Sequence, residues 1–227
     1  MVSGWRNPYV TSGIVIMFDG IWNIGGGAHS STSTKWRDLI RNVDATYSDT
    51  GIPSWKSNCW TNVRFGPVFS TTMPDLASTN GSTVEIVAEC INDIRGVIFG
   101  SYLVTNVYPN ANQCNFEYYT GKAFRNYYNG YPDFKTSNNT FSLNTKCYFA
   151  STRLSNVYKI YDGNGNQLAS STNNNLRFTA STMYIGGDAR PEMRFSGNIY
   201  AIRLYDRALS VDEIRYNYNI DKKRFNI

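Results

Sequence analysis

The chain has 227 residues, of which 17% are charged and 15% aromatic, and its formal net charge is +5. A chain of this length can bury about 70% of its unfolded surface, and so many aromatic residues exclude a disordered protein. The 22 Lys and Arg residues are scattered rather than gathered into one basic stripe, which argues against a nucleic-acid partner.

The N-terminal region predicts neither a signal peptide nor a membrane span. Its longest apolar run extends only from Ile14 to Phe18, whereas a membrane-crossing helix needs about 20 apolar residues. We therefore expect no membrane partner.

Along the chain the dominant hydrophobic period is two, which predicts β-strands with one buried face. In the segment 83–90 the even positions are apolar, and Glu85 and Glu89 fall on the opposite face, which we expect to meet solvent. Segment 147–154 alternates in the same way. Further strands are predicted at 13–18, 63–69, 96–104, 114–119, 123–129, 156–161, 182–186 and 195–205. Regular short strands separated by turn residues predict an all-β fold, a sandwich of two antiparallel sheets.

One turn and one helix are clear in the second half. Residues 162–166, Asp-Gly-Asn-Gly-Asn, predict a hairpin, because these residues tolerate a positive φ. The same residues could open a calcium-binding EF-hand loop, but Gln167 and Asn173 stand where that loop needs Gly and Glu. Ser210 and Glu213 form a capping-box pattern that begins a short C-terminal helix. The sequence contains no repeat and no linker, so we expect a single domain over 1–227.

The most specific stretch runs from Phe195 to Ile214, FSGNIYAIRLYDRALSVDEI. It resembles the closing strand and helix of laminin G-like domains of the concanavalin A type. Segments 13–20, 36–39 and 183–187 resemble other strands and motifs of that family. The resemblance implies a jelly-roll β-sandwich with one C-terminal helix and a role in binding sugars or proteins.

Short members of this family that are rich in Asn and Tyr are similar to phage virion proteins. This similarity implies a virion component with a glycan or host-cell-surface ligand, virion protein partners and a possible oligomer. The alternative is a structural or decoration protein that acts through protein contacts. A third hypothesis is a glycoside hydrolase, since some enzymes of this fold carry a Glu-x-Asp-x-Glu strand.

The hydrolase hypothesis depends on Glu85 and Glu89, which have the right spacing but flank Val87 instead of Asp. Their Cα atoms should lie roughly 13 Å apart, and a retaining pair needs its carboxyl groups at ~5–5.5 Å. Without the middle carboxylate, nothing in the strand would orient the pair. The single histidine, His29, follows a glycine triplet in a predicted loop. We therefore assign no catalytic residue.

Aromatic residues give the best binding signal, because a ring can cover the apolar face of a sugar while polar neighbours bond its hydroxyls. The predicted hairpin of 114–119 and 123–129 places Glu117 and Tyr119 on one face of its first strand, and Arg125 and Tyr127 on one face of its second. The sequence does not define the register that would join these faces. The further ligand-binding candidates, all in loop-like stretches, are Trp22, Trp55 and Trp60.

No metal or other cofactor is predicted. Calcium assists several proteins of this fold, and Asp19 and Asp188 are the weak candidates for it. The four cysteines lack zinc-site spacing and could form disulfides, although nothing in the sequence requires them: Cys59, Cys90, Cys114 and Cys147.

Overall fold

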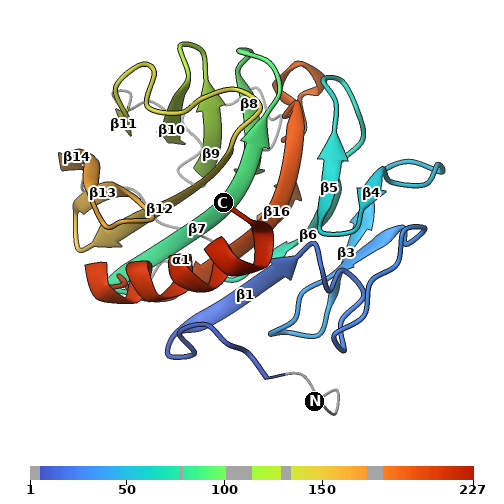
Figure 1. The fold of residues 1–227 in the computed structure, drawn as a ribbon, viewed down its shortest axis with the longest axis horizontal. Coiled ribbons are helices and arrows are strands. Elements are labelled where there is room, and N and C mark those ends of the chain that lie inside the picture. Colours follow the sequence, from blue (N-terminus) through green and yellow to red (C-terminus); the bar gives the residue numbers. More distant parts are fainter. Residues whose placement is uncertain (1–5, 77–78, 101–113, 129–133, 173–180) are drawn as a thin grey trace.

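The computed structural model describes residues 6–76, 79–100, 114–128, 134–172 and 181–227. They form two eight-stranded sheets, packed face to face, and one α-helix (Figure 1). Every strand pair is antiparallel, as the predicted two-sheet jelly-roll sandwich requires. The predicted fold class is confirmed, and the single domain over 1–227 stays a prediction.

The first sheet contains, in spatial order, β14 (Gln167–Thr172), β13 (Val157–Asp162), β12 (Lys146–Leu154), β7 (Gly81–Cys90), β16 (Gly197–Tyr205), β5 (Cys59–Asn62) and β4 (Trp55–Lys56), with β1 (Ile14–Asp19) beside β16. The second contains β11 (Phe134–Lys135), β10 (Ala123–Tyr128), β9 (Cys114–Tyr119), β8 (Gly96–Gly100), β15 (Ser181–Ile185), β6 (Phe69–Met73), β3 (Asp44–Tyr47) and β2 (Lys35–Arg37). A short 3-10 helix, η1 (Pro191–Met193), precedes β16.

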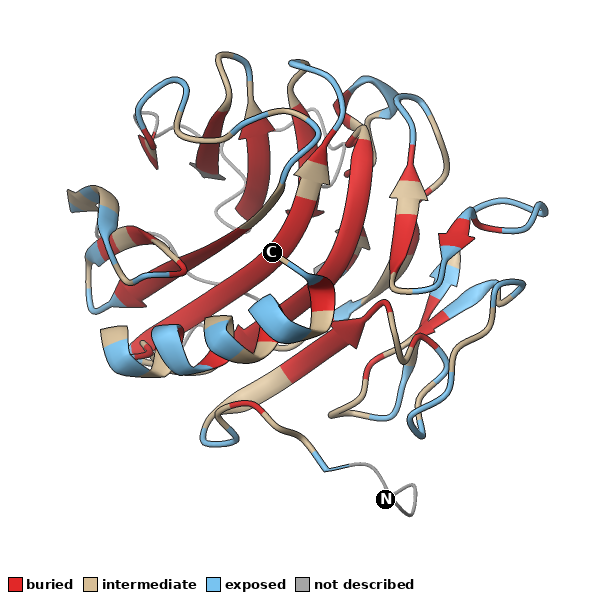
Figure 2. Ribbon diagram, in the orientation of Figure 1, coloured by how far each residue is buried: buried red, intermediate tan, exposed pale blue. Residues whose placement is uncertain are grey.

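The main core lies between the sheets and is strongly aromatic. Phe99, Phe116 and Phe124 of the second sheet meet Ile86 and Phe149 of the first, all at most 2% exposed. The even positions of 83–90 face this core, as their alternation predicts. Burying such apolar surface contributes roughly 25 cal/mol per Å², and Figure 2 shows the central strands of both sheets buried along most of their length.

The helix α1 (Val211–Phe225) lies across the outer face of the first sheet, in front of β7 and β16 (Figure 1). The predicted capping box is confirmed, because the Ser210 hydroxyl accepts from the Glu213 amide and the Glu213 carboxylate accepts from the Ser210 amide. Ile214 and Phe225 bury against Val87 and Tyr205 of the sheet in a second, smaller apolar cluster. The helix therefore covers a face of β7 that its sequence predicts to be exposed.

Of the other turns and strands predicted from the sequence, one hairpin is confirmed and one strand is wrong. The 162–166 hairpin is confirmed by the Gly165 amide donating to the Asp162 carbonyl. The strand predicted at 63–69 is wrong, since residues 63–68 connect β5 to β6. Positive φ at Phe65, +62°, does not fit a strand. Residues 101–104 of the predicted strand at 96–104 lie outside the described residues.

All four cysteines are thiols, and burial raises the pKa of the Cys59 thiol to about 11. Within the described part of the chain, no helix is long and apolar enough to cross a membrane.

Candidate functional site

The register of the β9–β10 hairpin joins the two faces that the sequence leaves unconnected. Arg125 lies directly opposite Glu117, and Ala123 opposite Tyr119. Gly121, at a φ of +85°, closes the turn between them. Because strand positions alternate, Glu117, Tyr119 and Arg125 share the outer face of the second sheet, away from the core side of Phe116. The tight hairpin brings three of the predicted ligand-binding residues together.

Glu117 is the buried anchor of this cluster. Its carboxylate is 0% exposed and accepts hydrogen bonds from Arg95 Nε at 2.9 Å and Nη2 at 3.1 Å. Arg125 Nε, from a side chain only 4% exposed, donates to the same carboxylate at 3.1 Å. Although partial burial opposes the charge of Arg95, its hydrogen bonds to Glu117 raise its pKa. The bidentate bond of Arg95 and the charge-assisted hydrogen bond of Arg125 fix the two guanidinium groups in place.

Tyr119 stands at the edge of the cluster and is partly exposed. Three cations surround its ring: the Arg125 guanidinium carbon lies 4.5 Å from the ring centroid, the Lys135 ammonium 5.1 Å and the Arg95 guanidinium carbon 5.8 Å. Each is within the ~6 Å range of a cation–π contact. We call Arg95, Glu117, Tyr119, Arg125 and Lys135 the Tyr119 cluster.

Two other predicted candidates flank this cluster. The backbone of Tyr127 pairs with Asn115 in the same hairpin, but its side chain lies outside the described residues. Asp188 is 0% exposed, and its carboxylate accepts from the Arg190 amide at 2.8 Å and from Asn115 Nδ2 at 3.2 Å. Arg190 also forms an ion pair with Asp188, so this carboxylate is held in a salt bridge.

The prediction that Glu85 and its side of β7 face solvent is wrong. The Glu85 carboxylate is 0% exposed, accepts from Arg203 Nε at 2.7 Å, and is bonded by Asn217 Nδ2 of α1 at 3.0 Å. Tyr148 donates to the same carboxylate. Burial raises the pKa of Glu85, and the charge of Arg203 counteracts this. Because α1 seals this group from substrate, Glu85 cannot be a hydrolase nucleophile in this fold.

Glu89 lies further along the same face and is only partly buried. Asn198 Nδ2 donates to its carboxylate at 2.8 Å, and the Tyr200 hydroxyl at 2.7 Å. Burial opposes the charge, but these hydrogen bonds prevail and lower the pKa of Glu89. A lowered pKa does not suit a general acid at neutral pH. The Glu85/Glu89 pair of the alternative hydrolase hypothesis is therefore not assembled for glycoside hydrolysis.

Asp19 and Trp22 lie next to the end of α1. The Asp19 carboxylate is 0% exposed and pairs with Arg224 at 2.6 Å. The same guanidinium stacks on the Trp22 ring, 4.0 Å from its centroid. Trp22 thus helps to seat α1, and its ring shares a face with a cation of the protein itself.

Trp55 and Trp60, predicted as ligand-binding candidates in loops, belong instead to the core. Trp60 is 0% exposed and Trp55 9%. The Trp60 ring packs edge-on against Phe69, with centroids 5.0 Å apart, and the Trp55 ring packs edge-on against Trp36, with centroids 5.1 Å apart. The polar residues around them indicate loops, but the short strands β4 and β5 turn both rings inward. His29, partly buried, bonds to the Gly20 carbonyl and packs on Trp55 rather than standing in a solvent-exposed loop.

The candidate calcium residues, Asp19 and Asp188, sit in separate arginine pairs. Calcium prefers six to eight oxygen ligands, and the described residues contain no group of three or more acidic, His or Cys side chains suited to a metal. A cation at either carboxylate would have to displace a guanidinium.

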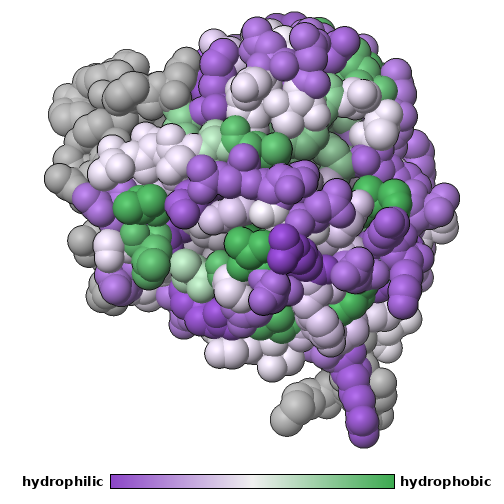
Figure 3. Space-filling view, turned by 60° about the vertical axis from the view of Figure 1, so that its left-hand side comes forward, coloured by the Kyte–Doolittle hydropathy of each residue, from purple (hydrophilic) through white to green (hydrophobic). Residues whose placement is uncertain are grey.

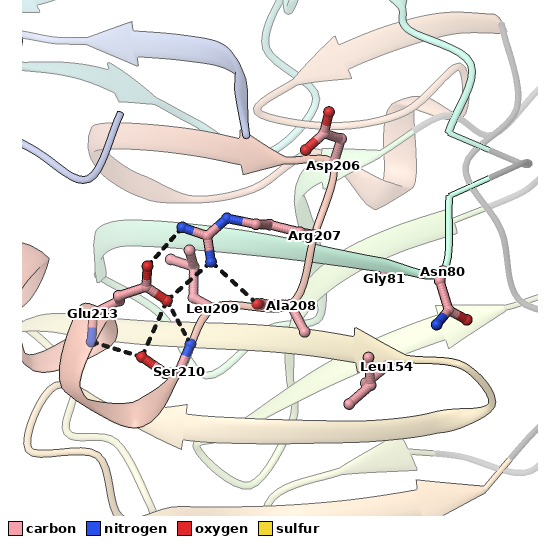
Figure 4. Close-up of a pocket in the computed structure, with 9 residues that line it drawn as sticks. All are labelled: Asn80, Gly81, Leu154, Asp206, Arg207, Ala208, Leu209, Ser210 and Glu213. Atoms are coloured by element: carbon pink, nitrogen blue, oxygen red, sulfur yellow. Dashed lines mark hydrogen bonds and ion pairs between the residues drawn. The ribbon is translucent and has the colours of Figure 1, made fainter. Parts of the chain in front are cut away.

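A pocket of about 560 Å³ lies where α1 begins, between the turn after β12 and the segment following β16 (Figure 4). Two of its three charged lining residues are paired with each other: Arg207 binds Glu213 at 2.6 Å, and Glu213 also accepts from Ser210. These bonds lower the pKa of Glu213 to about 2. The pocket's polar groups thus serve the helix cap, which makes it a weaker candidate than the Tyr119 cluster.

Sequence reasoning missed two members of the cluster, Arg95 and Lys135. Lys135 follows the hairpin in the short strand β11, opposite Arg125. Arg95 immediately precedes β8, whose Val97 pairs with Glu117. A two-residue strand and a loop residue leave no periodic signal, so only the tertiary structure brings them to Tyr119.

A laminin G family model described as the concanavalin A-like lectin/glucanases superfamily matches residues 76–215, more than half of the chain. The chain belongs to this family. No curated protein sequence matches it.

Solved structures show the same fold. Trypanosoma rangeli sialidase in complex with sialic acid is similar over 98% of this chain and 36% of that one, at 19% identity and a TM-score of 0.67. Its complex with the inhibitor DANA is similar over 96% of this chain and 36% of that one, at 21% identity and a TM-score of 0.64. The receptor-binding domain of botulinum neurotoxin C/D mosaic serotype is similar over 91% of this chain and 51% of that one, at 11% identity and 0.66. This chain spans about a third of the length of the sialidases, and at these identities the likeness shows the fold alone.

Proposed function

We propose that this protein is a non-catalytic glycan-binding module that uses the outer face of the second sheet. The observation that carries the proposal is the Tyr119 cluster, a partly exposed ring among fixed polar groups. Membership of a superfamily of lectins and glucanases supports a sugar as the ligand. The sealing of Glu85 under α1 supports binding without hydrolysis.

The experiment is a glycan-array and whole-cell binding assay with purified protein, with and without calcium. Tyr119→Ala should weaken saturable binding about tenfold, since a lost aromatic contact on a sugar costs roughly 1–1.5 kcal/mol. The matched control is Tyr216→Ala, which removes a tyrosine that is 55% exposed on α1. Chelating calcium should not change binding, because Asp19 and Asp188 are held by arginine.

Binding that survives Tyr119→Ala would move the site elsewhere on the protein. Release of sugar product from any glycan on the array would contradict the non-catalytic part of the proposal.

The same proposal places the module in a phage particle, where the glycan would belong to the host surface. This part rests on the similarity of short, Asn- and Tyr-rich chains of this fold to virion proteins. Detection of the chain by mass spectrometry in purified particles tests it, and its absence from them would contradict it.

A structural or decoration role is the second candidate, favoured by exposed apolar residues in the β5–β6 connection. Val63 is 60% and Phe65 63% exposed. On the face shown in Figure 3, however, hydrophobic residues form separate patches divided by polar ones, rather than one large patch suited to a stable protein interface. Self-association without glycan binding would favour this second role.

A further inference from the structure

The outer face of the second sheet carries a row of charges across three neighbouring strands. Glu117 on β9 lies opposite Arg125 on β10, which lies opposite Lys135 on β11. Because directly opposite residues point to the same side of a sheet, all three side chains start from the outer face. The order along the row is one carboxylate followed by two cations.

Two cations in direct cross-strand register are unfavourable. Their Cβ atoms lie about 4.5–5.5 Å apart, and like charges at this separation destabilise a sheet. The one carboxylate of the cluster, Glu117, is already shared between Arg125 and Arg95. The described residues place no carboxylate within ion-pair distance of the Lys135 ammonium, whose contact is the Tyr119 ring. Lys135 therefore brings to the cluster a positive charge that no carboxylate of the described residues pairs.

Burial divides the cluster into a fixed base and an accessible rim. Glu117 is 0% and Arg125 4% exposed, whereas the Arg95 side chain is 32% exposed and Lys135 and Tyr119 are partly exposed. The base is ordered before any ligand arrives, which lowers the entropic cost of binding. Positive charge at the rim of a partly desolvated surface attracts an anion more strongly than an isolated surface lysine does.

We propose that the ligand of this face is an acidic glycan, and that the partly exposed cations Lys135 and Arg95 recognise its carboxylate or sulfate group beside Tyr119. The inference deepens the proposed function and rests on it. The ring packs against the sugar, and the surplus positive charge selects the acidic substituent. An anion bound at the Lys135 ammonium would also offset the repulsion between Lys135 and Arg125.

The test compares glycans that differ only in the acidic group. Binding is measured by calorimetry for sialyllactose against lactose, and for chondroitin sulfate against its desulfated form, which separates a carboxylate from a sulfate ligand. Lys135→Ala should weaken binding of the preferred acidic glycan about tenfold and leave the neutral partner unchanged. Lys135→Arg should restore most of the affinity. Lys223→Ala removes the same charge from an exposed position on α1 and should have no effect. Binding should also weaken as salt rises from 50 to 500 mM, because ions screen partly exposed charges.

Three results would overturn the inference, and they are distinguishable. Equal affinity for acidic and neutral partners, unchanged by Lys135→Ala, would refute acidic recognition while leaving the glycan-binding function intact. An equal loss of affinity in Lys135→Ala and Lys223→Ala would show that only the overall charge of the protein matters. Tighter binding of a single-stranded oligonucleotide than of any acidic glycan would show the same. No binding of any glycan by the wild-type protein would refute the proposed function itself.

Discussion

The outer faces of the two sheets carry similar chemistry and differ in what covers them. On the first sheet, Arg203 pairs with Glu85 and with Asp221 of α1, and all three are 0% exposed. On the second sheet, Glu117 pairs with Arg95 and Arg125, but the group opens to solvent at Tyr119 and Lys135. In the first network two carboxylates share one guanidinium, and α1, which carries Asp221, closes the group from solvent. The surplus charge of the second belongs to a surface that we expect a ligand to complete.

An ion pair on the outer face of a strand does not by itself mark a binding site. A network that is closed, with each charged group hydrogen-bonded inside the protein, serves the fold. A network with partly exposed cations and too few carboxylates can serve a ligand. Substitutions in the closed network, at the cap of α1 and at Lys135 test this division.

The largest effect is expected at Arg203. Arg203→Met would leave the carboxylates of Glu85 and Asp221 buried without their guanidinium partner, and we expect it to reduce the free energy of unfolding by about 3–5 kcal/mol. Arg215→Met is the matched control, because Arg215 pairs with Asp212 at the surface of α1, with side chains 51% and 92% exposed. It should cost less than about 1 kcal/mol. Urea denaturation followed by circular dichroism measures both. A loss below ~1 kcal/mol for Arg203→Met would show that the network is not what holds α1 to the sheet.

How far the sequence predicts these two faces follows from the range of each signal. Alternation in β7 and the capping box at Ser210 are local, so both could be identified before any tertiary contact was known. The burial of Glu85 could not be predicted from the sequence. The helix α1 that covers it lies more than a hundred residues away, and the helical pattern of α1 does not indicate where the helix docks. The same limit explains Trp60, whose polar neighbours indicate a surface loop although the fold turns its ring inward.

The Tyr119 cluster was half predictable. The hairpin of β9 and β10 follows from the Thr-Gly-Lys turn between two alternating segments, and it supplies Glu117, Tyr119 and Arg125. The two additional cations at the Tyr119 ring are Arg95, a loop residue, and Lys135, which lies in a two-residue strand. Strands this short carry no period, and their place depends on pairing with the completed hairpin.

A middle-sized effect is expected at the cap of α1. Arg207 first, and then Ser210, lower the pKa of Glu213 from its ordinary 4.5 to about 2, while partial burial opposes them. A lowered folded-state pKa means that the carboxylate stabilises the fold above pH 4.5 and loses this contribution as the pH falls toward 2. Glu213→Gln should therefore cost about 1 kcal/mol at pH 7 and progressively less at lower pH.

Thermal or urea unfolding of wild type and variant between pH 7 and pH 2 measures this difference directly. Asp212→Asn is the control, since Asp212 is in the same helical turn and its side chain is 92% exposed. It should shift stability by less than ~0.5 kcal/mol throughout. A penalty for Glu213→Gln that stays constant with pH would contradict the assigned role of its charge.

The smallest effect, and the most informative for the comparison, is expected at Lys135. If the register of Arg125 and Lys135 is kept for a ligand, Lys135→Ala should leave the ligand-free protein equally stable or raise its free energy of unfolding by up to ~0.5 kcal/mol. Residues that serve binding commonly cost the fold some stability. Lys135→Glu sharpens the test, because a carboxylate opposite Arg125 should stabilise the protein further while abolishing acidic-glycan binding. Chemical denaturation without ligand measures both variants. A loss of 1 kcal/mol or more in Lys135→Ala would mean that this lysine supports the fold, as Arg203 does beneath α1, and would place both faces in the same class.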